Sequence, residues 1–272
     1  MKKIYFLFFS LMATVSFAQK VKVPVDTTVV TNHSVTIKGK NINYSAQTGM
    51  QPVWDDQGNP IASLYYTYYK KSDVKNTENR PLVISFNGGP GSASVWMHIA
   101  YTGPRILKID DEGYPVQPYG IKENPYSILD VADIIYVNPV NTGYSRPIPD
   151  ENGKVDKSKF FGVNQDISYL AEWLNTFVTR ENRWLSPKYL IGESYGTTRV
   201  SGLALELQDS QWMYLNGVIL VSPTELGIDR EGPVEVANRL PYFAATAWYH
   251  KLLPQELQSK SLTDLLEEVE EY

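Results

Sequence analysis

Hydrophobic and polar residues alternate along the N-terminal third of the chain. The clearest stretches are residues 35–37, 42–44 and 61–69. Because neighbouring side chains of a strand point to opposite faces, this period is typical of strands with one buried face. Turn-forming sequences separate the stretches, namely Gly39-Lys40 and DQGNP at 56–60. The pattern predicts antiparallel strands, preceded by an extended lead-in at 19–32 and followed by a polar surface loop at 70–80.

Four later stretches are continuously apolar, as expected of strands buried on both faces of a sheet. They cover residues 81–86, 133–137, 188–191 and 217–221. Helical patterns lie among them, one capped by Asp166 and one after Ser194. Their inward-facing residues are predicted to be Ile167, Leu170, Leu174, Phe177 and Val178, then Val200, Leu203, Ala204 and Leu207. Strands that alternate with helices predict an α/β fold with a mostly parallel sheet.

Both ends of the chain depart from this pattern. Residues 231–272 show only helical periodicity, which runs to the last residue without a cap, so we expect the chain to be part of a longer fold. At the other end, Lys2-Lys3, an apolar run at 4–15 and small residues up to Ala18 predict a signal peptide over 1–18. The protein would then be secreted or periplasmic, with no membrane span after cleavage. An uncleaved anchor is the alternative, although the run is shorter than the roughly 20 residues that cross a bilayer.

Composition excludes several classes of chemistry. The 272 residues include no cysteine, which rules out disulfides, thiolate nucleophiles and cysteine-bound metals. The three histidines lack the short spacing of a helical metal motif, so we expect no metal and no cofactor. The net charge of -5, with scattered Lys and Arg, argues against nucleic acid as a partner.

The sequence GESYG at 192–196 lies where a predicted strand ends and a helix begins. In this setting small neighbours allow a tight turn that exposes the serine hydroxyl beside a helix N-terminus, whose free N–H groups favour negative charge. Ser194 is therefore a candidate nucleophile. A structural turn serine is the alternative, because the bare pattern also occurs by chance.

A second glycine-rich sequence, NGGPG at 87–91, directly follows the first continuously apolar stretch. Acyl transfer needs backbone N–H groups directed at an oxyanion, and glycines let the backbone come close enough. We expect the N–H groups of Gly89 and Tyr195 to form this oxyanion hole. Taken alone, the sequence is equally consistent with a turn after a strand.

These motifs resemble those of the serine carboxypeptidase family. Further matching blocks are Gly103-Pro104, NPYS at 124–127 and NPVNTGYS at 138–145, in the family's order. The resemblance implies an α/β-hydrolase fold, with residues 19–230 as the N-terminal portion of the core and 231–272 as the start of a helical cap insertion. It also implies that the C-terminal part of the fold is missing from this chain.

The resemblance implies an exopeptidase that acts on peptides with a free C-terminus. Asn87 and Glu193 occupy the positions that bind the terminal carboxylate, with Gly88 and Tyr101 as further substrate-binding residues. A carboxyl group bonded to a carboxylate must be protonated, so acidic pH should favour binding. The chain departs from the family at Tyr101, where a second Glu is usual, and at Ser92, where Cys is common. The first departure puts strict carboxypeptidase specificity and an acid optimum in doubt.

The remaining members of a catalytic triad are not evident in the sequence. In this fold an acid and then a histidine follow the serine. His250 with Asp229 is one reading, but His250 lies in a stretch that resembles the start of the family's cap. We expect the catalytic Asp and His to lie beyond Tyr272, which would leave the isolated chain nearly inactive, with roughly 10⁶ of rate lost.

Two other functions fit the same residues. Serine chemistry passes readily between leaving groups, so an esterase or acyltransferase on this fold is the second reading. The third is an inactive hydrolase fragment that acts at most as a binding module. Turnover of short acyl esters without peptide release would favour the second reading.

Overall fold

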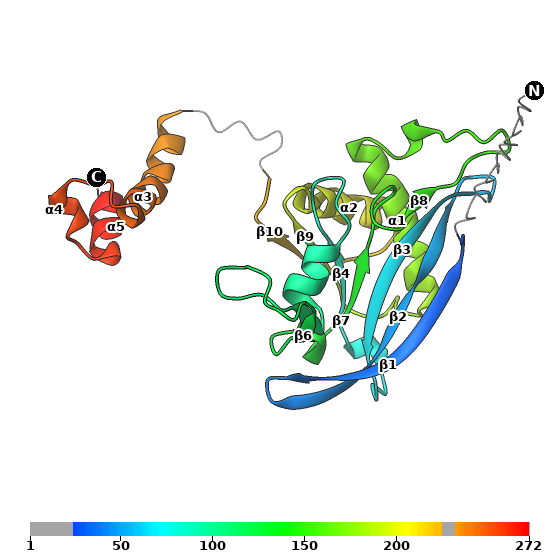
Figure 1. Ribbon diagram of the computed structural model, residues 1–272. Helices are drawn as coiled ribbons and strands as arrows, with labels where there is room; N and C mark the ends of the chain where they lie inside the picture. Colours follow the sequence, from blue (N-terminus) through cyan, green and yellow to red (C-terminus); the bar gives the residue numbers. More distant parts are fainter. Residues whose placement is uncertain (1–23, 225–231, 272) are drawn as a thin grey trace, which may run out of the picture. The chain divides into compact units, whose positions relative to one another are not determined.

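The computed structural model describes residues 24–224 and 232–271 (Figure 1). The chain divides into two units, one ending at Thr224 and the other beginning at Glu225. The predicted signal peptide and Asp229 lie outside the described residues. The domain boundary predicted after residue 230 lies outside them too and stays a prediction.

The first unit is built on a mixed eight-stranded sheet with the order β1-β2-β3-β7-β4-β9-β10, in which β8 pairs with β3. The antiparallel strands are β1 (Thr27–Ile37), β2 (Lys40–Trp54), β3 (Pro60–Lys71) and β8 (Arg146–Pro147). The parallel strands are β7 (Asp133–Val137), β4 (Leu82–Phe86), β9 (Lys188–Glu193) and β10 (Gly217–Val221). The predicted α/β fold is confirmed. Because four strands are parallel, the loops that follow them meet at one edge, called here the carboxyl edge.

Two long helices cover one face of the sheet. They are α1 (Val163–Arg180) and α2 (Tyr195–Gln211), which pack against each other and against the strands (Figure 1). The predicted apolar stripes of both helices face this core. The predicted cap is wrong. The helix α1 begins after Gly162, and Asp166 lies buried in the first turn, where its carboxylate pairs with Arg199 instead.

Shorter elements connect the strands. A π-helical turn, Met97–Thr102, lies over the other face, where Met97 packs among sheet residues. The strands β5 (Arg105–Leu107) and β6 (Ile121–Glu123) form a separate antiparallel pair. Single 3₁₀ turns occupy Thr77–Asn79, Ile128–Asp130 and Lys157–Lys159.

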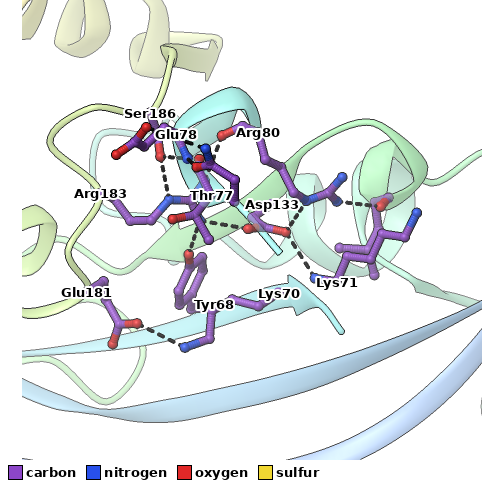
Figure 2. A network of polar contacts seen from close by, with 12 residues as sticks. Tyr68, Lys70, Lys71, Thr77, Glu78, Arg80, Asp133, Glu181, Arg183 and Ser186 are labelled. Atoms are coloured by element: carbon purple, nitrogen blue, oxygen red, sulfur yellow. Dashed lines mark hydrogen bonds and ion pairs between the residues drawn. The ribbon is translucent and has the colours of Figure 1, made fainter. Parts of the chain in front are cut away.

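A buried ionic network joins elements at the amino edge, where the parallel strands begin (Figure 2). Asp133 accepts hydrogen bonds from Arg80 Nε and Arg183 Nη1, each at 2.6 Å, and from the backbone N–H of Lys71 at 2.9 Å. Arg183 also donates to the hydroxyl of Tyr68 at 2.5 Å. The predicted surface loop at 70–80 therefore needs correction at both ends, because Lys70 and Lys71 belong to β3 and Arg80 is buried by this pairing.

The strand β10 differs from the other parallel strands. It is the last strand in the sheet order of the described residues, and Val218, Ile219 and Leu220 are 38–47% exposed. The prediction that this strand is buried on both faces is wrong for these residues. An apolar strand sequence indicates that a strand forms, whereas its burial depends on what packs beside it.

The second unit is helical, as predicted for the tail. It contains α3 (Pro233–Tyr249), α4 (Gln255–Gln258) and α5 (Leu262–Glu271). Leu265 of α5 is buried, and Trp248 Nε1 donates to the carbonyl of Lys260 at 3.0 Å. In the described parts of both units, no helix combines the length and apolarity needed to cross a bilayer.

Candidate active site

Ser194 lies in a sharp turn between β9 and α2. Its φ of 56° and ψ of -125° are rare for a residue with a side chain. The N–H of Ser194 donates to the carbonyl of Val221 at 3.0 Å, and its carbonyl accepts from the N–H of Thr197 at 2.9 Å. Bonds on both sides therefore hold the serine in this conformation, which is how a strained backbone persists at functional sites.

Glycines on each side of Ser194 let the turn close. A Cβ at Gly192 would lie 2.1 Å from the carbonyl oxygen of Gly196, and one at Gly196 would lie 2.9 Å from that of Phe86. These neighbours are backbone atoms of helix α2 and strand β4, so a side chain could not displace them without moving the helix or the sheet. The steric requirement explains the glycine spacing of the GESYG sequence.

The glycine-rich loop, residues 87–91, contacts this turn directly. A Cβ at Gly88 would lie 2.5 Å from the nitrogen of Tyr195 and 2.8 Å from Cβ of Ser194. Gly89 follows with a φ of 112°, a conformation that favours glycine. The N–H groups of Gly89 and Tyr195 therefore belong to two segments in backbone contact, and Tyr195 opens helix α2, where N–H groups lack helical acceptors. Such an arrangement can stabilise an oxyanion.

Asn87 and Glu193 are joined by their side chains. Asn87 Nδ2 donates to Glu193 Oε2 at 3.0 Å, while Asn87 Oδ1 accepts from the N–H of Met97 at 3.0 Å. Asn87 is buried and Glu193 is half-buried. An amide donor beside a carboxyl group can bind a carboxylate once the carboxyl carries a proton.

Tyr101 is more exposed than Asn87 and Glu193. It belongs to the π-helical turn and is 61% exposed, and its carbonyl accepts from Asn124 Nδ2 at 2.8 Å. Among the described residues, no hydrogen bond joins the Tyr101 hydroxyl to Asn87 or Glu193. The structure thus brings together Asn87, Gly88, Glu193, Ser194 and Tyr195, while the role of Tyr101 in substrate binding stays a prediction.

The histidines of residues 24–224 have other partners. His98 Nε2 is hydrogen-bonded to the Tyr69 hydroxyl at 2.7 Å, and its ring stacks on Tyr136. Burial lowers the pKa of His98 to about 4, so the imidazole is neutral at pH 7. His33 Nε2 lies 2.8 Å from the Thr31 hydroxyl on exposed β1. The third histidine ends helix α3 of the second unit. No hydrogen bond within the described ranges joins an imidazole to the Ser194 hydroxyl.

Sequence reasoning missed Arg199 behind the site and gave Asp166 a different role, that of a helix cap. Arg199 Nε donates to Asp166 at 2.6 Å, and Arg199 Nη1 donates to the carbonyl of Asn87 at 2.9 Å. A signal was present in the sequence, because Arg199 falls four residues before the inward-facing Leu203. An arginine on the apolar face of a helix must find buried partners.

The remaining family-like blocks support the loops. Asn124 Nδ2 donates to the carbonyl of Gly103, and Ser127 Oγ to that of Thr102, both at 2.8 Å. Ser145 Oγ donates to the carbonyl of Asn138 at 2.7 Å. These residues fix the ends of the π-helical turn and of the loop after β7.

Comparison with solved structures identifies the same fold in a peptidase. The crystal structure of KEX1(Δ)P, a prohormone-processing carboxypeptidase from Saccharomyces cerevisiae, matches 84% of this chain with a TM-score of 0.55. The match covers 47% of that chain at 20% identity, a level that shows the fold alone.

Sequence comparison identifies the family. The chain is 29% identical to serine carboxypeptidase-like 36 of Arabidopsis thaliana, over 61% of this chain and 33% of that relative. It is 27% identical to the pheromone-processing carboxypeptidase KEX1 of Saccharomyces cerevisiae, over 52% of this chain and 18% of that relative. The matched region is therefore a third or less of either relative. A model of the serine carboxypeptidase family matches residues 38–268. The chain thus belongs to the serine carboxypeptidase family.

Proposed function

We propose that this chain carries the nucleophile and the carboxylate-binding part of a secreted carboxypeptidase that releases C-terminal residues from peptides. The observation that carries the proposal is the contact between the two glycine-rich segments, in which Gly88 packs against Ser194 and the nitrogen of Tyr195. Family membership supports a peptidase and a hydrolase. The N-terminal sequence supports secretion.

In the proposed reaction, Ser194 Oγ attacks the carbonyl carbon of the last peptide bond. The N–H groups of Gly89 and Tyr195 stabilise the oxyanion that forms. The C–N bond then breaks, a proton passes to the leaving amine, and an acyl-enzyme remains on Ser194 until water hydrolyses it. The base and the acid that orients it belong, in this proposal, to residues that follow Tyr272 in a longer protein.

Asn87 and Glu193 would hold the terminal carboxylate of the substrate. Asn87 Nδ2 and a protonated Glu193 both present a hydrogen to that group, and its position fixes which peptide bond lies over Ser194. The half-buried Glu193 is adjacent to Ser194 in the chain, so the carboxylate would lie near the reacting serine.

Ligand binding tests this clamp without requiring turnover. We expect an N-blocked dipeptide with a free carboxylate to bind about tenfold or more tightly than its amide at pH 4.5, because charge-assisted hydrogen bonds are the stronger ones. The preference should shrink at pH 7.5. Titration calorimetry at both pH values measures the ratio of the two affinities. Glu193→Gln is the matched variant: its amide donates at any pH, so the ratio should no longer depend on pH. Equal affinity for acid and amide at both pH values would refute the clamp.

Covalent labelling tests the nucleophile separately. A fluorophosphonate should modify Ser194 over hours, and Ser194→Ala should remove the label. Ser201→Ala is a matched control, because Ser201 is an exposed serine of the same helix. Labelling that is unchanged in Ser194→Ala would contradict the proposed role of Ser194.

An esterase or acyltransferase on the same fold is the second candidate. The tyrosine at position 101, where the family usually has a second Glu, favours it, because no second acid then shares a proton with Glu193. Acyl transfer from short esters, together with no preference for free carboxylates, would support this function over the first.

A further inference from the structure

Arg199 lies buried between the glycine-rich loop and the serine turn. It is 1% exposed and belongs to α2, five residues after Ser194. Its guanidinium donates to Asp166 at 2.6 Å, to the carbonyl of Asn87 at 2.9 Å and to the carbonyl of Pro90 at 3.3 Å. Two of these three partners are therefore backbone atoms of the glycine-rich loop.

The two carbonyls bracket the glycines of the loop. Asn87 precedes Gly88-Gly89 and Pro90 follows them, so one rigid guanidinium spans the pair. Glycine has no side chain to pack, and its backbone is the most freely variable of any residue. A planar fork of donors restricts such a segment where a flexible ammonium would not. Arg199 therefore supplies a restraint that the loop sequence cannot supply itself.

Asp166 is in turn held in place. Its Oδ1 accepts from the Tyr169 hydroxyl at 2.9 Å, and that hydroxyl accepts from the N–H of Val140 at 3.0 Å. The chain of bonds runs from the loop after β7, through α1, to Arg199 and the glycine-rich loop. The Arg199 guanidinium also lies 5.2 Å from the centre of the Tyr195 ring. It thus contacts both segments that contribute the proposed oxyanion donors.

We propose that Arg199 is a positioning residue which, held by Asp166, sets the glycine-rich loop at the distance from Ser194 where the Gly89 and Tyr195 N–H groups share one oxygen atom. The inference rests on the proposed function of these N–H groups. It predicts that loosening Arg199 affects covalent chemistry at Ser194 more than carboxylate binding. The Asn87 side chain is separately held by Met97 and Glu193.

The test compares Arg199→Lys with Arg183→Lys in the 272-residue chain. Both arginines are 1% exposed and lie 2.6 Å from a buried aspartate, but Arg183 belongs to the amino edge. We expect Arg199→Lys to slow fluorophosphonate labelling of Ser194 by roughly 10- to 100-fold, since losing a single oxyanion donor costs about 10²–10³. The affinity for an N-blocked dipeptide should change by less than about threefold. Arg183→Lys should leave labelling per folded molecule unchanged.

Hydrogen exchange gives a readout that needs no reaction. Deuterium uptake in peptides covering 87–92 should accelerate at least about tenfold in Arg199→Lys, because amides exchange through local openings. Uptake there should match wild type in Arg183→Lys. Equal uptake by both variants would overturn the positioning role, even if the parent chain does not label. Labelling that persists in Ser194→Ala, by contrast, counts against Ser194 as the nucleophile.

A double variant separates positioning from folding. Arg199→Met alone leaves the Asp166 carboxylate without its partner in the core, so this variant should be less stable than the wild type. Arg199→Met combined with Asp166→Asn removes both charges. We expect the double variant to regain thermal stability relative to Arg199→Met while uptake at 87–92 stays fast. Recovery of slow, wild-type uptake would show that the loop keeps its conformation without Arg199, and would refute the proposal.

Discussion

Two buried arginine–aspartate networks lie at opposite edges of the same sheet and differ in what they hold. At the amino edge, Asp133 accepts hydrogen bonds from Arg80 and Arg183 (Figure 2). Arg183 also donates to the Tyr68 hydroxyl and to the backbone carbonyl of Arg80. At the carboxyl edge, Asp166 accepts a hydrogen bond from Arg199, which also donates to two backbone carbonyls of the glycine-rich loop. The charges and distances are alike, but the partners are not.

The difference shows that the function of a buried ion pair depends on its partners. The Asp133 network ends on Tyr68 of β3 and on the backbone of Arg80 and Leu129. Tyr68 and Leu129 are themselves buried in the core. The Arg199 pair closes on a loop with a glycine in a left-handed conformation, which packs little by itself. Breaking the first network should therefore cost stability, whereas breaking the second should disturb the candidate site.

The largest effect is expected from Asp133→Ala. It leaves two buried guanidinium groups without a counter-ion, so the free energy of unfolding should fall by roughly 3–5 kcal/mol. Denaturant unfolding measures the loss. Asp26→Ala breaks the exposed pair with Arg180 and should cost less than about 1 kcal/mol. Similar losses in both variants would show that the amino-edge network does not stabilise the fold as its burial indicates.

His98 should make the free energy of unfolding depend on pH, with an effect nearly as large as that of Asp133→Ala. Its pKa is about 4 when folded, against about 6.5 in an unfolded chain. The unfolded state therefore binds more protons between these values, and stability is full above pH 6.5 and falls as the pH drops towards 4. The loss should be about 3 kcal/mol. Between pH 7.5 and 4.5 the free energy of unfolding of His98→Gln should fall by about 2.5 kcal/mol less than that of the wild type, measured by unfolding at each pH. An equal pH slope in the variant would contradict the assignment.

A smaller loss of stability is expected where the glycine-rich loop meets the serine turn. A methyl group from Gly88→Ala would press on the nitrogen of Tyr195, which should destabilise the fold by about 1–3 kcal/mol. Labelling of Ser194 should also fall, because the two segments are forced apart. Gly91→Ala is the control, since no atom lies within 4 Å of its added Cβ. Unchanged labelling in Gly88→Ala would mean that this contact is not needed at the site.

The smallest effect is expected from Tyr101→Phe. The tyrosine is exposed, so stability should change by less than about 0.5 kcal/mol. If its hydroxyl donates to a bound carboxylate, affinity for an N-blocked dipeptide should fall about fivefold, the equivalent of one hydrogen bond. Calorimetry distinguishes this from no change, which would remove Tyr101 from the substrate-binding residues.

Local sequence was sufficient for much of the fold. Strand patterns repeat every two residues and helix patterns about every 3.6, so both can be recognised from neighbouring residues. The apolar stripes of the two long helices, from Ile167 to Val178 and from Val200 to Leu207, occupy the core as predicted. The serine turn was also foreseeable, because steric exclusion at Gly192 and Gly196 acts between near neighbours in the chain.

Tertiary structure alone decided how distant residues pair. The sequence predicted Asp166 as a helix cap, but its carboxylate binds Arg199, which lies 33 positions further along the chain. The sequence predicted that Arg80 lies in a surface loop, but packing places Asp133 beside it and buries it. Periodicity records which face of an element is apolar, but a charged side chain is placed by the partners that three-dimensional packing brings within about 3 Å.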